Sequence, residues 1–193
     1  MRRASLAVST IVFLALTTQA PPQAASFPAV RGGGGAVVSP EATSTRAGLD
    51  MLRAGGNAVD AAVATALAMA VVHPEAGNLG GGGFAVVKVD GELATLDFRE
   101  TAPAAAHRDM YLDEQGEPVP EASWVGPLAA GVPGSPAGLH ELHQKFGSLP
   151  WAAVVQPAIV LARDGFLVTR RLHEAIEETR GRLARFPETA AVA

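Results

Sequence analysis

The sequence contains no cysteine, which excludes disulfide bonds, thiolate metal sites and cysteine nucleophiles together. It also has no excess of positive charge, since 15 Lys and Arg stand against 19 Asp and Glu and the formal net charge is −4. No basic patch with interleaved aromatic residues is present, so nothing in the composition indicates nucleic-acid binding. Aromatic residues make up only 5% of the chain while alanine and glycine are abundant, so its helices can pack closely.

Several motifs of nucleotide-binding and hydrolytic enzymes are also missing. The glycine run at residues 80–83 is not followed by the Gly-Lys-Ser/Thr of a Walker loop. It precedes an expected strand, whereas the dinucleotide fingerprint follows a strand and opens a helix. No Gly-x-Ser-x-Gly elbow occurs. His140 and His143 are three residues apart, not four as in the metalloprotease motif, so we expect a surface helix that simply carries two histidines. We also expect no metal or organic cofactor.

The first 25 residues have the pattern of a signal peptide. Two arginines follow the initiator methionine, and the apolar run at residues 6–16 is too short to span a bilayer. Small residues follow, and cleavage is plausible between residues 20 and 26. We therefore expect residues 1–25 to be a signal peptide and the mature protein to be periplasmic or secreted, without a membrane partner after export. An N-terminal anchor or simple disorder is the alternative. Residues 26–35, which end in four glycines, are expected to be a linker.

The remaining residues, 36–193, are numerous enough for one domain with a sizeable core. Hydrophobic periodicity and Gly/Pro punctuation predict an α/β (α+β) fold. The expected strands cover residues 36–38, 84–89 and 92–98, and the expected helices cover residues 40–54, 58–72, 137–146, 150–155, 157–163 and 169–185. The helix at 58–72 has only two polar residues, Asp60 and Thr65, so we expect it to be buried on nearly every side.

Local signals place the ends of these helices. Ser39 and Ser135 each precede a proline and are expected to cap the helices that follow. Pro157 would cost a hydrogen bond inside a helix, so we expect it to separate two short helices. Residues 107–124, rich in Asp, Glu, Pro and Gly, are expected to form an excursion over the surface.

Arg99 is the strongest candidate for a binding residue. Asp90-Gly91 predicts a tight hairpin between strands 84–89 and 92–98, and period-two alternation places Arg99 on the polar face at the strand end. The strand at 84–89 is apolar on both faces apart from one lysine, which predicts a sheet covered on both sides. A guanidinium in this position can hold a carboxylate through two parallel hydrogen bonds.

Each candidate also has a simpler explanation. Residue types alone favour a salt bridge between Arg99 and Asp97 or Glu100 over a substrate clamp. The amides of residues 80–83 could cradle an anion, but close packing of glycine backbone against a neighbouring element is favoured. His107 has no evident partner in the sequence, and neither it nor the pair His73 and Glu75 is assigned a role.

The order of motifs in this sequence resembles the N-terminal part of γ-glutamyltransferase (γ-glutamyltranspeptidase). The resemblance covers about residues 36–185, and its motifs lie at residues 56–64, 72–74, 77–84, 97–103, 131–134, 157–159 and 161–166. A series of motifs in the right order is far more specific than any one of them. The resemblance implies the αββα four-layer sandwich of N-terminal-nucleophile hydrolases, of which residues 36–193 would be an incomplete part.

The resemblance also implies a function. In this family a precursor cleaves itself into a large and a small subunit, and the new N-terminal Thr attacks the γ-glutamyl amide of glutathione. The acyl group then passes to water or to an amino-acid or peptide acceptor. Arg99 matches the arginine of the family's Asp-Phe-Arg-Glu motif, which implies that it binds the substrate's α-carboxylate and reverses the preference for a salt bridge.

The resemblance is incomplete in one important respect. The family's nucleophile lies in a Thr-Thr-His type motif that is absent here, so we expect no catalytic residue in this chain and no turnover by the chain alone. The small subunit from the same precursor is the expected protein partner. The alternatives are a non-catalytic periplasmic module that binds an amino acid through Arg99, and a related acylase acting on β-lactam side chains.

Overall fold

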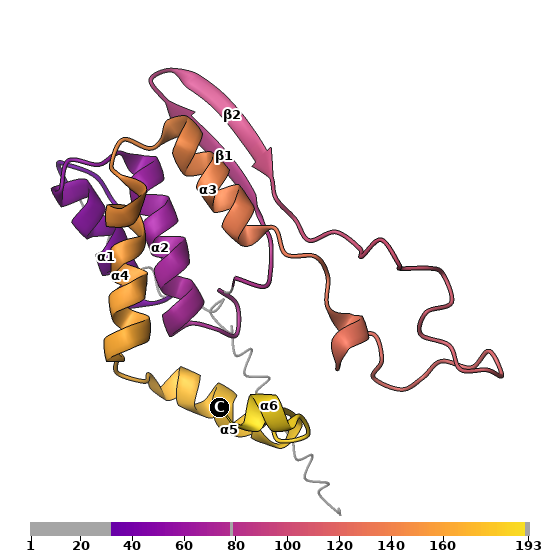
Figure 1. Cartoon of the computed structure of the whole chain (residues 1–193). Helices are drawn as coiled ribbons and strands as arrows, with labels where there is room; N and C mark the ends of the chain where they lie inside the picture. The colour runs from indigo at the N-terminus through magenta and orange to yellow at the C-terminus, as the bar shows by residue number, and fades with distance from the viewer. Residues whose placement is uncertain (1–31, 78, 192–193) are drawn as a thin grey trace, which may run out of the picture. The chain divides into compact units, whose positions relative to one another are not determined.

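The computed structural model of the chain describes residues 32–77 and 79–191. The expected signal peptide and most of the expected linker lie outside these ranges. The described elements, shown in Figure 1, are α1 (Ala42–Arg53), α2 (Ala58–Val72), β1 (Phe84–Val89), β2 (Glu92–Asp97), η1 (Pro127–Ala129), α3 (Ser135–Phe146), α4 (Trp151–Asp164), α5 (Arg170–Leu183) and α6 (Pro187–Ala190). Among these helices none is both long and apolar enough to cross a bilayer.

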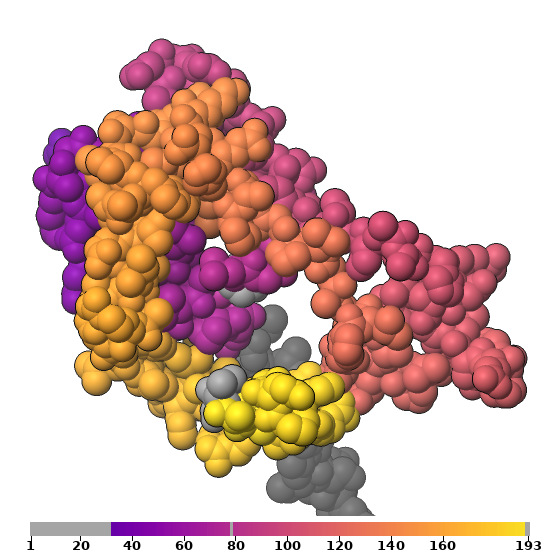
Figure 2. All heavy atoms as spheres, in the orientation of Figure 1, coloured from indigo at the N-terminus to yellow at the C-terminus, as the bar shows by residue number. Residues whose placement is uncertain are grey.

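Helix α2 is the centre of the core, as its composition predicted. It contacts α1, α3 and α4, and Figure 2 shows the orange surface of α3 and α4 lying over it. Val63 and Ala64 are fully buried there. The core side chains are Met51, Val59, Ala61, Val63, Ala64, Leu67, Leu139, Leu142, Val154 and Ala158. Small residues dominate this set, so the helices approach closely and the core is formed mainly between helices.

Strands β1 and β2 form the predicted antiparallel hairpin. Asp90 and Gly91 both have positive φ, 50° and 87°, as the turn between them requires. Phe84 pairs with Asp97 and Val89 with Glu92. The face that carries Ala85, Val87, Val89, Ala94 and Leu96 packs against the core beside α3.

The opposite face of the hairpin differs from the expectation. Phe84 and Val86 are 65% and 73% exposed, so among the described residues the hairpin is covered on one face only. The apolar pattern of β1 thus predicts its covered face correctly, and the covering of the second face stays a prediction.

The start of the described chain corrects two expectations. Residues 36–38 form no strand, because no described strand lies beside them to complete a ladder, and Val38 is 92% exposed. Ser39 does not cap α1, whose N-cap is Glu41 without a side-chain hydrogen bond. The Ser39 hydroxyl instead contacts those of Ser44 and Thr45, at 2.8 and 2.7 Å between oxygens.

Ser135 is also not a cap. It is the first residue of α3, and Gly134 occupies the N-cap position. Its backbone N–H is bonded to the carbonyl oxygen of Gly81 at 2.9 Å. The N–H at the start of the helix would otherwise need a capping side chain as acceptor, and here a carbonyl from another part of the chain accepts it.

The expected break at Pro157 does not occur, and α4 is one helix. Proline lacks the N–H that would donate to the carbonyl oxygen of Ala153. That residue is exposed, so water can donate the hydrogen bond instead. Val154 and Ala158, four residues apart, are both buried against the core. Packing on both sides of the proline outweighs the local cost of about 3 kcal/mol. The helix ends at Gly165, as predicted, with φ of 84°.

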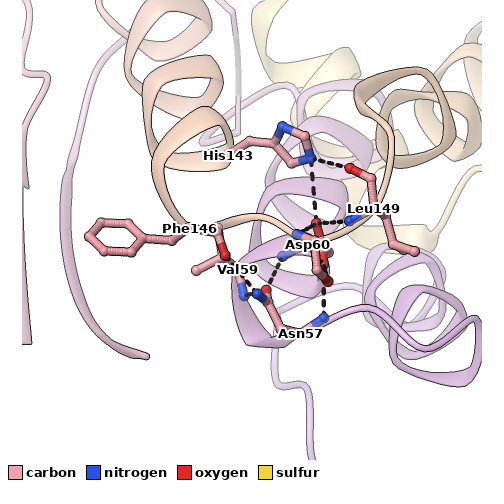
Figure 3. Close-up of polar contacts among 7 residues, drawn as sticks. Asn57, Val59, Asp60, His143, Phe146 and Leu149 are labelled. Carbon is pink, nitrogen blue, oxygen red and sulfur yellow. Dashed lines mark hydrogen bonds and ion pairs between the residues drawn. The ribbon is translucent and has the colours of Figure 1, made fainter. Parts of the chain in front are cut away.

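A buried carboxylate joins the start of α2 to the loop between α3 and α4. The Asp60 side chain has no exposed surface. Its oxygens accept hydrogen bonds from the Asn57 N–H at 2.8 Å, the Ser148 hydroxyl at 2.6 Å and the Leu149 N–H at 3.2 Å (Figure 3). Burial raises the pKa of Asp60, but the hydrogen bonds from Ser148, Asn57 and Leu149 outweigh it and leave the pKa below the ordinary value.

His143 lies beside this carboxylate and is buried, which corrects the expectation of a surface position. Its Nε2 is 2.9 Å from the carbonyl oxygen of Leu149 and 3.4 Å from Oδ1 of Asp60 (Figure 3). Because a carbonyl only accepts, Nε2 carries the proton. We therefore assign a structural role to Ser148, His143 and Asp60. Serine and histidine each contact the carboxylate, and they do not form a proton relay from serine through histidine.

Replacing Asp60 by Asn should destabilise the protein by about 2–3 kcal/mol, because an amide cannot accept from all these donors. Asp60 has a lower pKa folded than unfolded. Its stabilisation is therefore complete above the ordinary Asp pKa and is lost as pH falls through the lowered folded value.

The measurement is thermal unfolding of the protein at neutral and acidic pH. The control is Asp50→Asn, which changes an exposed aspartate that pairs with Arg53. Equal midpoints for Asp60→Asn and the wild type at neutral pH would contradict the account.

Candidate functional site

Arg99 lies just beyond the end of β2, on the exposed face of the hairpin. Its side chain is 65% exposed. The Asp97 carboxylate accepts the backbone N–H of Arg99 at 3.0 Å, which fixes the turn of the main chain as it leaves the strand. Side chains alternate between the two faces along the strand, and Leu96 faces the core. The guanidinium of Arg99 therefore lies on the open face, as the sequence predicted.

Two side chains contact the Arg99 guanidinium. Its Nε donates to Oε2 of Glu100 at 3.0 Å, and its central carbon lies 5.9 Å from the centroid of the Phe84 ring. Among the described residues, the two terminal nitrogens have no hydrogen-bond partner. The expected salt bridge is thus formed with Glu100, and it leaves the outer edge of the guanidinium open.

The electrostatics of Glu100 suit this arrangement. Its pKa lies below the ordinary value, because its own backbone N–H and then the Arg99 side chain stabilise the ionised form, with a smaller contribution from the Gly82 amide. Glu100 is therefore a carboxylate at neutral pH. The pair carries no net charge, and a bound carboxylate would contact the edge of Arg99 that lies away from Glu100.

The glycine run packs against the strand end that carries Arg99. A Cβ on Gly82 would lie 2.5 Å from the carbonyl oxygen of Phe98 and 2.6 Å from the amide nitrogen of Glu100. A Cβ on Gly83 would lie 3.0 Å from the Phe98 ring. Close packing, the favoured explanation of these glycines, is therefore confirmed for both positions.

The start of α3 approaches the same strand end from the other side. A Cβ on Gly134 would collide with the Phe98 carbonyl, and one on Gly138 would collide with the Phe98 side chain. The carbonyl oxygen of Gly81 accepts the N–H groups of Gly134 and Ser135, both at 2.9 Å. The backbone before Arg99 is thus held between the glycine run and α3.

A pocket of about 270 Å³ opens beside this packing, lined by Ala66, Met69, Ala76, Gly77, Gly81, Gly82, Gly83, Phe98, Glu100, Ser135 and Leu139. Among the described residues that line it, Glu100 is the charged one. A larger groove of about 700 Å³ lies between residues 34–40 and α2, and its lining has no charged side chain. The glycine run and Glu100 thus border a small cavity, whereas the described lining of the larger groove is uncharged.

The remaining candidates do not converge on Arg99. Nδ1 of the buried His73 lies 3.7 Å from Glu41 and 3.5 Å from Glu75, and Glu75 also accepts from Arg171 at 2.6 Å. Sequence reasoning missed this cluster, whose only signal was the spacing of His73 and Glu75. Within the described residues, no group of three His, Cys, Asp or Glu side chains could hold a metal ion.

Two further histidines, His140 and His107, also lie apart from the site. His140 stacks edge-on against Trp151, with 5.0 Å between ring centroids. His107 is exposed in the segment between β2 and η1, where its surroundings offer no catalytic role.

Comparison with known proteins identifies close relatives. The sequence model of the Gamma-glutamyltranspeptidase family matches residues 44–192. The chain is 53% identical over 135 residues to a glutathione hydrolase proenzyme of Pseudomonas aeruginosa, covering 70% of this chain and 24% of that protein. It is 51% identical over 152 residues to one of Escherichia coli, covering 78% and 26%. The chain thus spans about a quarter of the length of these curated relatives.

Solved structures agree. The chain superposes on Helicobacter pylori gamma-glutamyltranspeptidase with a TM-score of 0.80 at 44% identity, covering 84% of this chain and 47% of that one. A cephalosporin acylase from Bacillus halodurans gives a TM-score of 0.66 at 31% identity, covering 86% and 31%. The expected fold class, the N-terminal portion of an N-terminal-nucleophile hydrolase, is confirmed by the similarity to the transpeptidase structures.

Replacing Gly138 by Ala should destabilise the protein by about 1–3 kcal/mol, because the new methyl group collides with the Phe98 side chain. The matched control is Gly181→Ala in α5, where nothing would lie within 4 Å of the added methyl group and a gain of up to about 1 kcal/mol is expected. Thermal unfolding of both variants measures this. Equal effects of the two substitutions would show that the contact with Phe98 is not tight.

Proposed function

Because this chain belongs to the gamma-glutamyltranspeptidase family, we propose that it is the N-terminal part of the large subunit of a γ-glutamyltransferase or glutathione hydrolase. The complete enzyme cleaves the γ-glutamyl amide of glutathione and related compounds. It passes the γ-glutamyl group to water or to an amino-acid or peptide acceptor.

The observation that carries this proposal is the geometry of Arg99. The guanidinium is exposed, its Nε is occupied by Glu100 and its two terminal nitrogens are open within the described part of the chain. These nitrogens form a planar pair of donors that matches the α-carboxylate of a γ-glutamyl group bidentately. We call this arrangement the carboxylate clamp.

The clamp contributes to catalysis by position. Holding the α-carboxylate at one end of the glutamyl chain directs the γ-carbonyl at the other end toward a nucleophile at a fixed distance. Arg99 makes the same contact before and during the reaction. Losing it should therefore raise KM more than it lowers kcat.

The nucleophile belongs, in this proposal, to polypeptide beyond Ala193. The relatives that are called proenzymes are about four times as long as the matched region, which supports an N-terminal Thr of a small subunit from the same precursor. The Thr hydroxyl attacks the γ-carbonyl, the amine of the substrate leaves, and water or an acceptor amine resolves the acyl ester.

The organisation of the chain completes the proposal. Residues 1–25 are a signal peptide, residues 26–35 a linker, and residues 36–193 the incomplete first part of the large subunit. The mature enzyme is periplasmic or secreted. The exposed apolar side chains of Phe84 and Val86 on the outer face of the hairpin support a large-subunit part that is completed by further polypeptide.

A second candidate is an acylase acting on β-lactam side chains, which the similarity to the cephalosporin acylase favours. The identity to the transpeptidase structure is higher, 44% against 31%, and so is the TM-score. The two activities are separated by assaying the complete enzyme with glutathione and with a β-lactam that carries a glutaryl side chain. Preferential cleavage of the β-lactam would favour the acylase.

The 193-residue chain alone should not turn over a γ-glutamyl anilide, because its described residues offer no nucleophile beside a base. Without the rest of the enzyme it should also be poorly soluble, since Phe84, Val86 and Leu93 are exposed apolar side chains on the outer face of the hairpin. Release of the aniline from this substrate by the purified chain, above a buffer control, would contradict this. Titration with glutamate by calorimetry tests the remaining alternative, since tight binding by the chain alone would favour a binding module.

In the complete enzyme, Arg99→Lys should raise KM for a γ-glutamyl substrate by about tenfold, because one charge-assisted hydrogen bond of a bidentate pair is lost. Steady-state kinetics with a γ-glutamyl anilide measure this. Arg108→Lys, at an exposed arginine next to Asp109, is the matched control and should leave KM unchanged. The clamp would be ruled out by an Arg99→Lys enzyme with the kcat/KM of the wild type.

A further inference from the structure

We propose that Phe84 is a positioning residue for Arg99, holding the guanidinium through its aromatic face so that the terminal nitrogens are aligned for the substrate carboxylate. The inference rests on the proposed function. It assigns a role to a residue at the other end of the hairpin from the tight turn, at the first position of β1.

The strand register brings the two residues together. Phe84 is directly opposite Asp97, and Arg99 is the diagonal neighbour two residues further along the same chain. Residues at this diagonal share one face of a hairpin and lie within reach of each other when one is aromatic and the other is long. Phe84 and Arg99 thus lie on the open face. Phe98, which lies between Asp97 and Arg99 in the sequence, faces the core.

The contact has the geometry of a cation–π interaction. The central carbon of the guanidinium is 5.9 Å from the centroid of the Phe84 ring, inside the range in which the negative face of the ring attracts a cation. The ring also remains 65% exposed, so it does not serve to fill the core among the described residues. Within the described part of the chain, the contact with Arg99 is therefore the interaction that gives this ring a role.

Phe84 and Glu100 constrain Arg99 from different directions. Glu100 accepts from Nε and so fixes one edge of the guanidinium plane. The ring centroid lies 5.9 Å from the guanidinium carbon, and its attraction for the cation favours one orientation of that plane. An exposed arginine without such contacts would lose rotamer freedom when it binds a carboxylate, so fixing it in advance lowers the cost of binding.

The test uses the complete enzyme and a γ-glutamyl anilide. Phe84→Leu keeps an apolar side chain but removes the ring, and it should raise KM by about twofold to fivefold with kcat nearly unchanged. Phe84→Tyr keeps the aromatic face and should retain the wild-type KM. Val86→Leu is the matched control, because Val86 lies on the same face of β1 and is 73% exposed, yet has no contact with Arg99.

A double-mutant cycle makes the test specific. In an Arg99→Gln background, Phe84→Leu should have no further effect on KM, since the ring then has no guanidinium to hold. An equal effect of Phe84→Leu in both backgrounds, or a fall in kcat with KM unchanged, would overturn the inference. If Arg99→Gln itself leaves KM unchanged, the proposed clamp fails. If Arg99→Gln raises KM and Phe84→Leu does not, only the role of Phe84 fails.

Discussion

The arrangement of the whole candidate site depends on how closely the backbone at Phe98 is enclosed. Gly82 approaches from the glycine run, and Gly134 and Gly138 approach from α3, at distances that exclude any Cβ. Two hydrogen bonds from the start of α3 to Gly81 hold these segments together. Since Arg99 follows Phe98 directly, this enclosure sets the position from which the guanidinium reaches outward. The buried Asp60 carboxylate acts further away, by fixing the loop between α3 and α4 to the start of α2.

The proposed function depends on a strand end that packing holds rigidly and on an exposed charge that projects from it. The strand end is fixed by packing, while Arg99 projects into the open with Glu100 at one edge and Phe84 against its carbon. Such a charge needs no deep pocket to recognise a carboxylate, because a bidentate pair of donors supplies the geometry. In the proposed enzyme, the attacking hydroxyl would come from another part of the polypeptide. Binding and chemistry would be divided between the large and the small subunit.

Sequence reasoning predicted the parts that depend on local patterns. The bounds of α2, the Asp90-Gly91 turn and the exposed face for Arg99 follow from periodicity and turn chemistry, and the structure confirms them. The errors arise where tertiary contacts decide. Pro157 stays inside α4 because packing on both sides compensates for its lost donor, and His143 is buried because it meets Asp60, 83 residues earlier in the chain. The enclosure of Phe98 could not be derived from four glycines alone, since the sequence does not say which backbone they approach.

The most direct test of this account compares two substrates that differ only in the group Arg99 is proposed to bind. One is a γ-glutamyl anilide with a free α-carboxylate, and the other carries an α-carboxamide in its place. The account predicts that the complete wild-type enzyme prefers the carboxylate strongly in kcat/KM, and that Arg99→Gln removes most of this preference. A preference of the same size in the Arg99→Gln enzyme would show that another residue binds the carboxylate, and the central claim would be wrong.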